Sequence, residues 1–185
     1  MQGSMPPHFA LFDTPVGACA LAWGWHGIVG VLLPEATPAA TCARLRRRHP
    51  GAIESPLPLA LQTVVARIQA LLTGARDDLA DIELDLRELA PFQREVYALT
   101  RRIGPGRTRS YGEIASELGA PQAARAVGQA LGANPFPIIV PCHRVLAAGA
   151  KAGGFSAPGG TRTKLRLLEI EGALLRGTPG LFDTP

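Results

Sequence analysis

The sequence has few aromatic residues, no long apolar run and only three cysteines. Phe, Trp and Tyr make up 5% of the 185 residues, and no apolar stretch approaches the roughly 18 residues of a membrane-spanning helix. Cys19, Cys42 and Cys142 lie far apart without a C-x-x-C pair, which argues against a disulfide framework and a zinc ribbon. The N-terminal residues resemble no secretory signal, so we expect a cytoplasmic protein without a membrane anchor.

The charge is divided unevenly between the two halves of the chain. Apolar residues make up 46% and charged residues 18% of the sequence, which is typical of a globular protein. Residues 101–176 contain eleven Lys or Arg against four Glu, a net charge of +7, whereas the remainder has a net charge of −3. The asymmetry favours a polyanionic partner for the C-terminal half, most simply nucleic acid, although a solvated basic surface has the same composition.

The N-terminal half has the pattern of a small sheet with helices. Residues 8–33 alternate short apolar runs with Gly and Pro and predict two or three antiparallel strands. Amphipathic helices are predicted near 37–49 and 58–73, and a short alternating strand at 81–86. One group of basic residues in the first helix is assigned to a solvated face: Arg44, Arg46, Arg47 and Arg48. We therefore expect an N-terminal α/β domain over residues 1–86.

The C-terminal half has the layout of a helix-turn-helix. A helix is predicted over 90–103, and Ser110 with Glu113 three residues later forms a capping box for the next one. Gly119 suits the end of that helix, and Pro121 suits the first turn of its successor. Two short helices joined by a tight turn are typical of DNA-binding domains.

The second of these helices is rich in small residues. Ala124, Val127, Gly128 and Leu131 form its apolar stripe, which leaves Arg125 on a different face. Small side chains would let the backbone approach a DNA groove, but they would equally permit close packing against another helix.

In the segment "IIVPCHRV", a predicted strand over 138–140 is followed closely by the thiol of Cys142. Adjacent side chains of an extended chain point to opposite faces, so Cys142 and His143 can cooperate only through a bridging water or a turn after the strand. His143 could then withdraw the thiol proton, and the thiolate is the strong nucleophile. The alternative is an inert buried thiol.

Five motifs in order carry a resemblance to a known family. "SYGEIA", "ARAVGQALGAN", "NPFPII", "PCHRV" and "GGFSAPGG…K…LLEIEG" closely resemble the O6-alkylguanine-DNA alkyltransferases across residues 91–173. The resemblance implies an α/β N-terminal domain with a small antiparallel sheet and a mainly α, winged-helix-like C-terminal domain over 87–176. Residues 177–185 would form a tail.

The resemblance also implies roles for five residues. Cys142 would accept the alkyl group, and His143 would activate it through water. Glu171 would orient the imidazole, although its position also suits an exposed helix glutamate. Tyr111 would supply a proton or hydrogen bond to the departing guanine, although it also suits the core. Asn134 would tie the recognition helix to the Cys142 segment.

Further residues are assigned to the base pocket and to DNA. The predicted pocket residues are Val145, Phe155, Ser156 and Lys164, within or near the loop 153–157, with Ser156 donating to the guanine oxygen. The predicted DNA contacts are Ala123, Ala124, Arg125, Gly128 and Arg144. Extruding a nucleotide from the duplex costs roughly a few kcal/mol, and Arg125 would fill the gap in the stack.

The expected function is direct reversal of O6-methylguanine, with O4-methylthymine as a second substrate. The alkyl group would pass irreversibly to Cys142 of a monomeric protein that needs neither a cofactor nor a metal. Three alternatives remain: a lesion-binding relative without transfer, a helix-turn-helix regulator and a cysteine hydrolase. Phe155 stands where many members have a tyrosine and the loop is longer by "AP", so the pocket is expected to differ in size.

Overall fold

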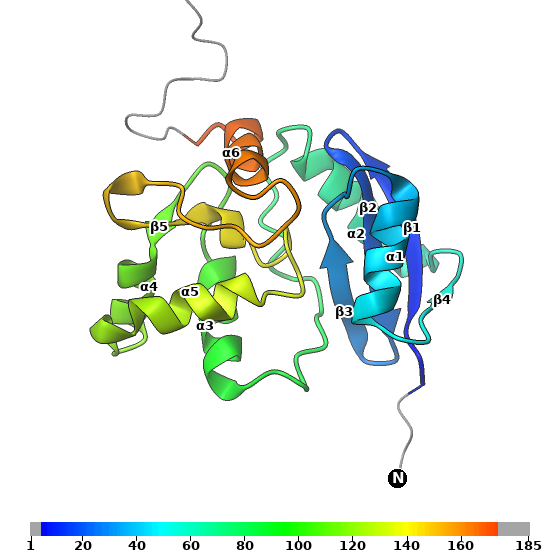
Figure 1. Ribbon diagram of the computed structural model, residues 1–185, viewed down its shortest axis with the longest axis horizontal. Helices are drawn as coiled ribbons and strands as arrows, with labels where there is room; N and C mark the ends of the chain where they lie inside the picture. The colour runs from blue at the N-terminus through cyan, green and yellow to red at the C-terminus, as the bar shows by residue number, and fades with distance from the viewer. Residues whose placement is uncertain (1–4, 174–185) are drawn as a thin grey trace, which may run out of the picture.

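The computed structural model describes residues 5–173, with a sheet and two helices on one side and a helical C-terminal half on the other (Figure 1). The predicted tail 177–185 lies outside the described residues. None of the described helices is both long and apolar enough to cross a membrane.

The sheet has the strand order β3-β2-β1-β4. Its strands are β1 (His8–Thr14), β2 (Gly17–Gly24), β3 (Gly27–Leu32) and β4 (Ile53–Glu54). The first three are antiparallel, as predicted, but β4 pairs in parallel with β1, so the sheet is mixed and not purely antiparallel. The parallel pairing is possible because an intervening helix returns the chain to the same end of the sheet.

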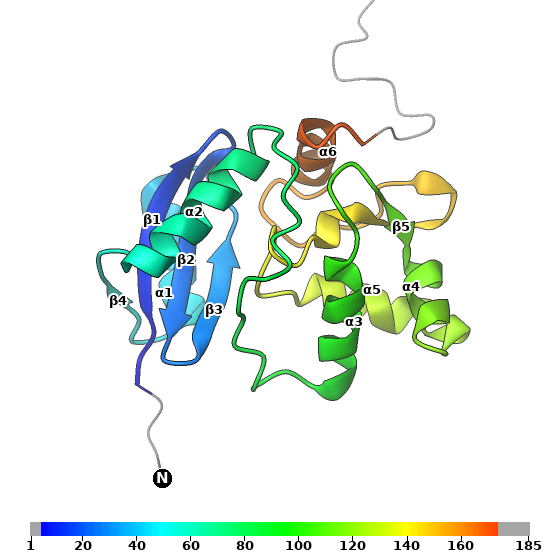
Figure 2. The ribbon, with the colours of Figure 1, turned by 180° about the vertical axis from the view of Figure 1, so that it is seen from behind.

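One helix covers each face of this sheet. Helix α1 (Pro38–Arg48) covers the face of the sheet that is turned to the viewer in Figure 1. Helix α2 (Leu59–Leu71) covers the opposite face, which is turned to the viewer in Figure 2. Alternate residues of β2 face opposite ways, so Ala20 packs in the core with Leu45 of α1, whereas Leu21 packs in the core with Ile68 of α2. Both predicted helices are confirmed.

The predicted strand at 81–86 is wrong. The segment makes only one isolated bridge, between Leu84 and Ile28, and is otherwise irregular. Its backbone follows the edge of β3 for a single pair of hydrogen bonds, from Asp85 N to Ile28 O (2.8 Å) and from Ile28 N to Glu83 O (3.4 Å). The alternation of apolar and polar residues reflects which side chains face the core, although the segment forms no strand.

The C-terminal half contains the predicted helix-turn-helix. Its helices are α3 (Pro91–Arg101), α4 (Tyr111–Glu117), α5 (Ala124–Gly132) and α6 (Thr161–Ile170), and β5 (Arg109–Ser110) pairs in parallel with β6 (Val145–Leu146). The capping box is present, with Glu113 N donating to Ser110 Oγ (3.1 Å) and Ser110 N to Glu113 Oε2 (2.6 Å). Gly119 ends α4 with a φ of +73°, a conformation that favours glycine.

The predicted strand over 138–140 is also wrong. Ile138 has a φ of +77°, which is rare for a β-branched residue, and the segment is a series of turns. All three of its side chains are buried in a hydrophobic core that also includes Val31 of β3 and Val96 of α3. Burial in this core outweighs the strand preference of Ile and Val. Because the core runs through both halves of the chain, the domain boundary at residue 86 stays a prediction.

Candidate active site

Cys142 opens a short 3-10 turn that spans Cys142–Arg144. The turn is one of the two arrangements that would let Cys142 and His143 cooperate; the other is a bridging water. Cys142 is only 8% exposed. Burial raises the pKa of its thiol, while Asn134 and the positive charge of Lys164 act in the opposite direction.

Asn134 joins the end of α5 to the segment that leads to Cys142. Its side-chain Nδ2 donates to Val140 O (2.9 Å), and its Oδ1 accepts from Phe136 N (2.9 Å). The next residue is held by the N-terminal sheet, because Val31 N donates to Pro135 O (2.9 Å). The structure thus anchors this segment to both the recognition helix and β3.

Glu171, at the end of α6, binds two side chains of the turn. His143 Nε2 lies 2.8 Å from Glu171 Oε1, and Arg144 Nε and Nη2 donate to Oε2 (2.9 Å) and Oε1 (2.7 Å). Burial alone would raise the pKa of Glu171, but the hydrogen bonds from His143 and Arg144 lower it to about 2. Glu171 is therefore a buried carboxylate and not the exposed helix glutamate of the alternative interpretation.

The structure contradicts the assignment of Arg144 to DNA contacts. Its side chain is fully buried, and besides its bonds to Glu171 its Nη1 donates to Ile103 O (2.5 Å). A guanidinium that is fully buried against an internal carboxylate and an internal carbonyl cannot reach a phosphate of bound DNA. Arg144 is a positioning residue for Glu171.

The second ring nitrogen of His143 has no hydrogen-bond partner within residues 5–173. Burial lowers the pKa of His143, which favours the neutral imidazole. Since the Glu171 carboxylate can only accept, the proton of neutral His143 lies on Nε2, and Nδ1 is left as an acceptor. The buried turn thus contains a proton acceptor one residue from the thiol.

A cleft of about 600 Å³ extends from Cys142 to the recognition helix α5. Its walls include Tyr111 and the loop residues Gly154, Phe155 and Ser156. From α5 it is lined by Ala124, Arg125, Gly128, Gln129, Leu131 and Gly132. Arg125 is exposed at the helix surface. The predicted DNA contact Ala123, which ends the turn before α5, lies outside the lining. The sequence analysis did not assign Gln129, Leu131 or Gly132 to the site.

Lys164 and Val145, predicted to contact the substrate base, lie behind the cleft and not in its wall. Both are fully buried, and Lys164 Nζ donates to Val145 O (2.6 Å) and to Tyr111 Oη (3.5 Å). The ammonium also lies over the rings of Tyr111 and Phe155, 5.7 and 6.0 Å from their centroids. Burial lowers the pKa of Lys164 to about 8 and raises that of Tyr111. Lys164 supports the two aromatic walls.

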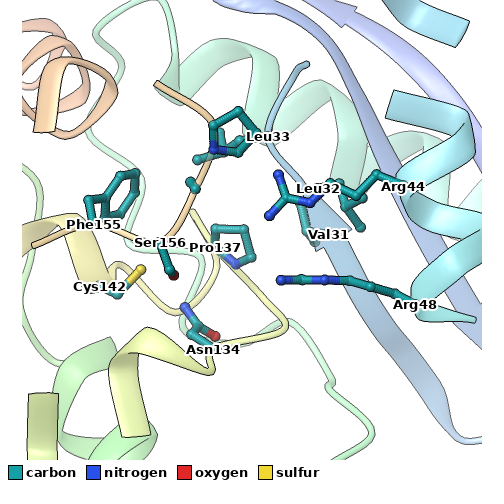
Figure 3. A pocket seen from close by; sticks show the side chains of 12 residues that line it. Val31, Leu32, Leu33, Arg44, Arg48, Asn134, Pro137, Cys142, Phe155 and Ser156 are labelled. Atoms are coloured by element: carbon teal, nitrogen blue, oxygen red, sulfur yellow. The ribbon is translucent and has the colours of Figure 1, made fainter. Parts of the chain in front are cut away.

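A second, smaller cavity of about 20 Å³ lies between the two halves of the chain, on the side of Cys142 toward α1 (Figure 3). Arg44 and Arg48 of α1 point into it from one side, and Asn134, Pro137 and Cys142 line the other. The assignment of these arginines to a solvated face is wrong for Arg44, whose side chain is 18% exposed and pairs with Glu35. Their spacing of four residues was the sequence signal for a shared helix face.

Within residues 5–173, no group of three or more His, Cys, Asp or Glu residues is placed to hold a metal ion.

A buried cysteine at the end of a cleft, with a helix-turn-helix along its rim, defines a DNA-binding protein with a nucleophilic thiol. Residues 91–173 match the family model for the 6-O-methylguanine DNA methyltransferase DNA-binding domain. The methylated-DNA–protein-cysteine methyltransferase of Mycobacterium tuberculosis is 39% identical over 176 residues, which cover 95% of this chain and 99% of the relative. The chain belongs to the methylated-DNA–protein-cysteine methyltransferase family, whose members repair O6-methylguanine in DNA.

Two further similarities bear on DNA. The crystal structure of Mycobacterium tuberculosis OGT in complex with DNA aligns with a TM-score of 0.72 and 37% identity, covering 89% of this chain and 92% of the other. A Thermus thermophilus relative named as a DNA base-flipping protein is 43% identical over 126 residues, covering 68% of this chain and 82% of that protein.

Proposed function

We propose that this chain removes the alkyl group from O6-alkylguanine in double-stranded DNA by transferring it to Cys142. The observation that carries the assignment is the position of Cys142, which lies at the inner end of the cleft along α5 and next to the His143–Glu171 pair. O4-methylthymine is a second substrate in this proposal, because its methyl group is also bound to an exocyclic oxygen.

The proposed reaction begins with loss of the thiol proton. His143 Nδ1 takes the proton from Cys142 through a bridging water, and the Glu171 carboxylate stabilises the resulting imidazolium. The sulfur then attacks the alkyl carbon, so that a C–S bond forms while the C–O6 bond breaks. Tyr111 donates a hydrogen bond or proton to the departing guanine, on which negative charge develops. The proton that leaves Cys142 balances the one that guanine gains.

The remaining site residues have supporting roles in this proposal. Ser156 donates to the guanine oxygen from the loop that lines the cleft, and the Phe155 ring forms the adjacent wall. Asn134 holds the Cys142 segment against α5. Ala123, Ala124 and Gly128 let the backbone of α5 approach the DNA. The monomeric state, the cytoplasmic location and the division at residue 86 stay predictions.

A lesion-binding relative that transfers nothing is the principal alternative, because one relative is named as a base-flipping protein. A protein that only binds lesions needs no acceptor thiol, whereas this chain has Cys142 in the "PCHRV" motif. Incubation with O6-methylguanine duplex DNA followed by intact-protein mass measurement separates the two functions. Binding without a change in mass would overturn the proposal.

The same experiment, with excess methylated DNA, is expected to stop at one methyl group per chain. A thioether on Cys142 has no good leaving group, and neither other cysteine is placed to resolve it: Cys19 is fully buried in the sheet and Cys42 lies on α1. Peptide mapping of the product should locate the methyl group on Cys142. More than one equivalent of repaired guanine per chain would show turnover and exclude a suicide reaction.

Replacing Arg125 with alanine is expected to slow transfer from duplex DNA far more than transfer from a single strand. In our proposal its side chain fills the stack that the extruded nucleotide leaves, which offsets an unstacking cost of a few kcal/mol. A loss of about 2 kcal/mol corresponds to a roughly 30-fold slower reaction. Single-turnover rates on both substrates measure the effect.

Arg47→Ala is the matched control for Arg125→Ala, because Arg47 is an exposed arginine on α1 outside the cleft. It should leave both rates unchanged. Equal slowing by Arg125→Ala on duplex and single strand would contradict the stacking role and leave a simple phosphate contact.

A further inference from the structure

The hydroxyl of Tyr97 connects helix α3 to the recognition helix α5. Tyr97 Oη donates to Ala130 O (2.8 Å), and the tyrosine is only 1% exposed. The two helices lie side by side in both ribbon views (Figure 1, Figure 2). Burial raises the pKa of Tyr97 to about 12, so the phenol stays protonated and donates throughout the neutral range. The methyl transfer proposed above makes no use of this contact.

The acceptor of this hydrogen bond lies in the last turn of α5. Because the helix ends at Gly132, the amide of Asn134, which would donate to Ala130 O in a longer helix, donates to the next carbonyl instead. The backbone bond that Ala130 O receives, from Ala133 N, is 3.2 Å long. Tyr97 provides a shorter bond from outside the helix. It thereby fixes the end of α5 at the point where the segment leading to the thiol begins.

Asn134 links the end of α5 to the thiol. Its side chain donates to Val140 O and accepts from Phe136 N, so it holds both ends of the segment that precedes Cys142. Burial raises the pKa of the Cys142 thiol, and hydrogen bonding by Asn134 lowers it. A shift of Asn134 with the end of α5 would therefore change both the position of the thiol and the fraction of it that is ionised.

We infer that Tyr97 is a positioning residue for the alkyl transfer, because its hydroxyl holds the end of α5 where Asn134 can fix the Cys142 segment. Tyr97 lines neither of the two cavities at the thiol, so its effect on the reaction is indirect. The ring fills the core as a phenylalanine ring would, and only the hydroxyl makes the link to α5. This inference rests on the proposed function and adds a residue of α3 to the same site.

Tyr97→Phe is the test, because it keeps the ring and removes the hydroxyl. Single-turnover transfer from saturating O6-methylguanine duplex should be about tenfold slower at neutral pH, which is the effect of one hydrogen bond expressed fully in the barrier. Duplex binding should change by less than about twofold, since Tyr97 lies outside the cleft.

The pH profile distinguishes positioning of the thiol from a general loss of stability. A weaker contact with Asn134 raises the pKa of the Cys142 thiol, so the slowing should diminish as the pH is raised toward about 9 and more thiolate forms. The other titratable groups around the thiol, Tyr111, His143 and Lys164, are the same in both proteins. The ratio of the two rates at each pH therefore isolates the effect of the hydroxyl.

Thr100→Val is the matched control. Thr100 is also a fully buried residue of α3, but its Oγ1 donates to Val96 O of the same helix (2.7 Å). Its loss should lower the urea midpoint of unfolding by a similar amount without slowing transfer. A double substitution tests the route to the thiol: in an Asn134→Ala background, Tyr97→Phe should slow transfer by less than about twofold.

Four results would overturn the inference. An unchanged rate in Tyr97→Phe would mean that the hydroxyl does not position the site, and equal slowing by Thr100→Val would assign the effect to stability. Slowing by the same factor at every pH would mean that ionisation of the thiol is not affected. An undiminished effect in the Asn134→Ala background would mean that Tyr97 acts by another route. Failure of the proposed function is a separate result, since the unsubstituted protein would then gain no methyl group.

Discussion

Replacing Cys142 with alanine is expected to abolish alkyl transfer completely while leaving duplex binding nearly unchanged. The thiol forms the only bond to the alkyl group in the proposed reaction, whereas binding depends on α5 and the basic surface of the C-terminal half. Intact mass after incubation with labelled O6-methylguanine duplex measures transfer. Fluorescence anisotropy with the same duplex measures binding.

Cys19→Ala and Cys42→Ala are the matched controls, and both should transfer normally. Burial raises the pKa of Cys19 to about 11, so almost none of it is thiolate at neutral pH. Cys42 lies on α1 and lines neither cavity. A methyl label on either residue in the Cys142→Ala protein would contradict the assignment of the acceptor.

Replacing Arg144 with methionine is expected to lower the free energy of unfolding by about 3–5 kcal/mol. The substitution removes one partner of a buried ion pair and leaves the Glu171 carboxylate with His143 alone. Urea denaturation at neutral pH measures the loss. If the variant folds, its alkyl-transfer rate shows whether Glu171 still holds the His143 imidazole in place without Arg144.

Arg102→Met makes the same change in an exposed pair, because Arg102 lies 3.6 Å from Glu117 with its side chain 72% exposed. Surface pairs of this kind contribute at most about 1 kcal/mol. Similar losses from the two variants would contradict the buried pair as a main source of stability in this region.

The buried pair also predicts a window of acid instability. The pKa of Glu171 is lowered from its ordinary 4.5 to about 2, so its stabilising contribution is fully present above pH 4.5 and is lost as the pH falls toward 2. Unfolding free energies of the wild type should fall through this window. Glu171→Gln, which cannot titrate, should show a flatter profile.

Local pattern was enough to predict most of the helices and the antiparallel strands. The Ser110 capping box and the Gly119 helix end depend on neighbours within a few residues, so they can be read before the fold is known. The same holds for the alternation in residues 8–33, which has a period of two wherever one face of a strand packs on a helix. A turn after Cys142 was one of two arrangements that the chemistry allowed, and the sequence did not show its 3-10 geometry.

The wrong predictions concern segments whose conformation or partners are set by residues far away in the sequence. Residues 138–140 have the composition of a strand, but their side chains are buried in the core and Ile138 takes a positive φ, so the segment forms turns. Arg144 was assigned to DNA contacts, but the structure buries its side chain completely. Its actual partner, Glu171, is 27 residues away and reaches it only after α6 packs on the turn.

The sequence by itself determined the helix-turn-helix and the family, and it singled out Cys142 and its imidazole neighbour as the candidate nucleophile and base, because each is encoded in a contiguous motif. Tertiary structure alone decided which charges are buried and which cavities meet at the thiol. Arg44 and Arg48 belong to a helix at the other end of the chain, and their approach to Cys142 depends on β3 holding the Asn134 segment through Pro135. Whether an arginine side chain is exposed, forms a buried ion pair or lines a cavity depends on which elements pack against it. That packing is set by the whole fold.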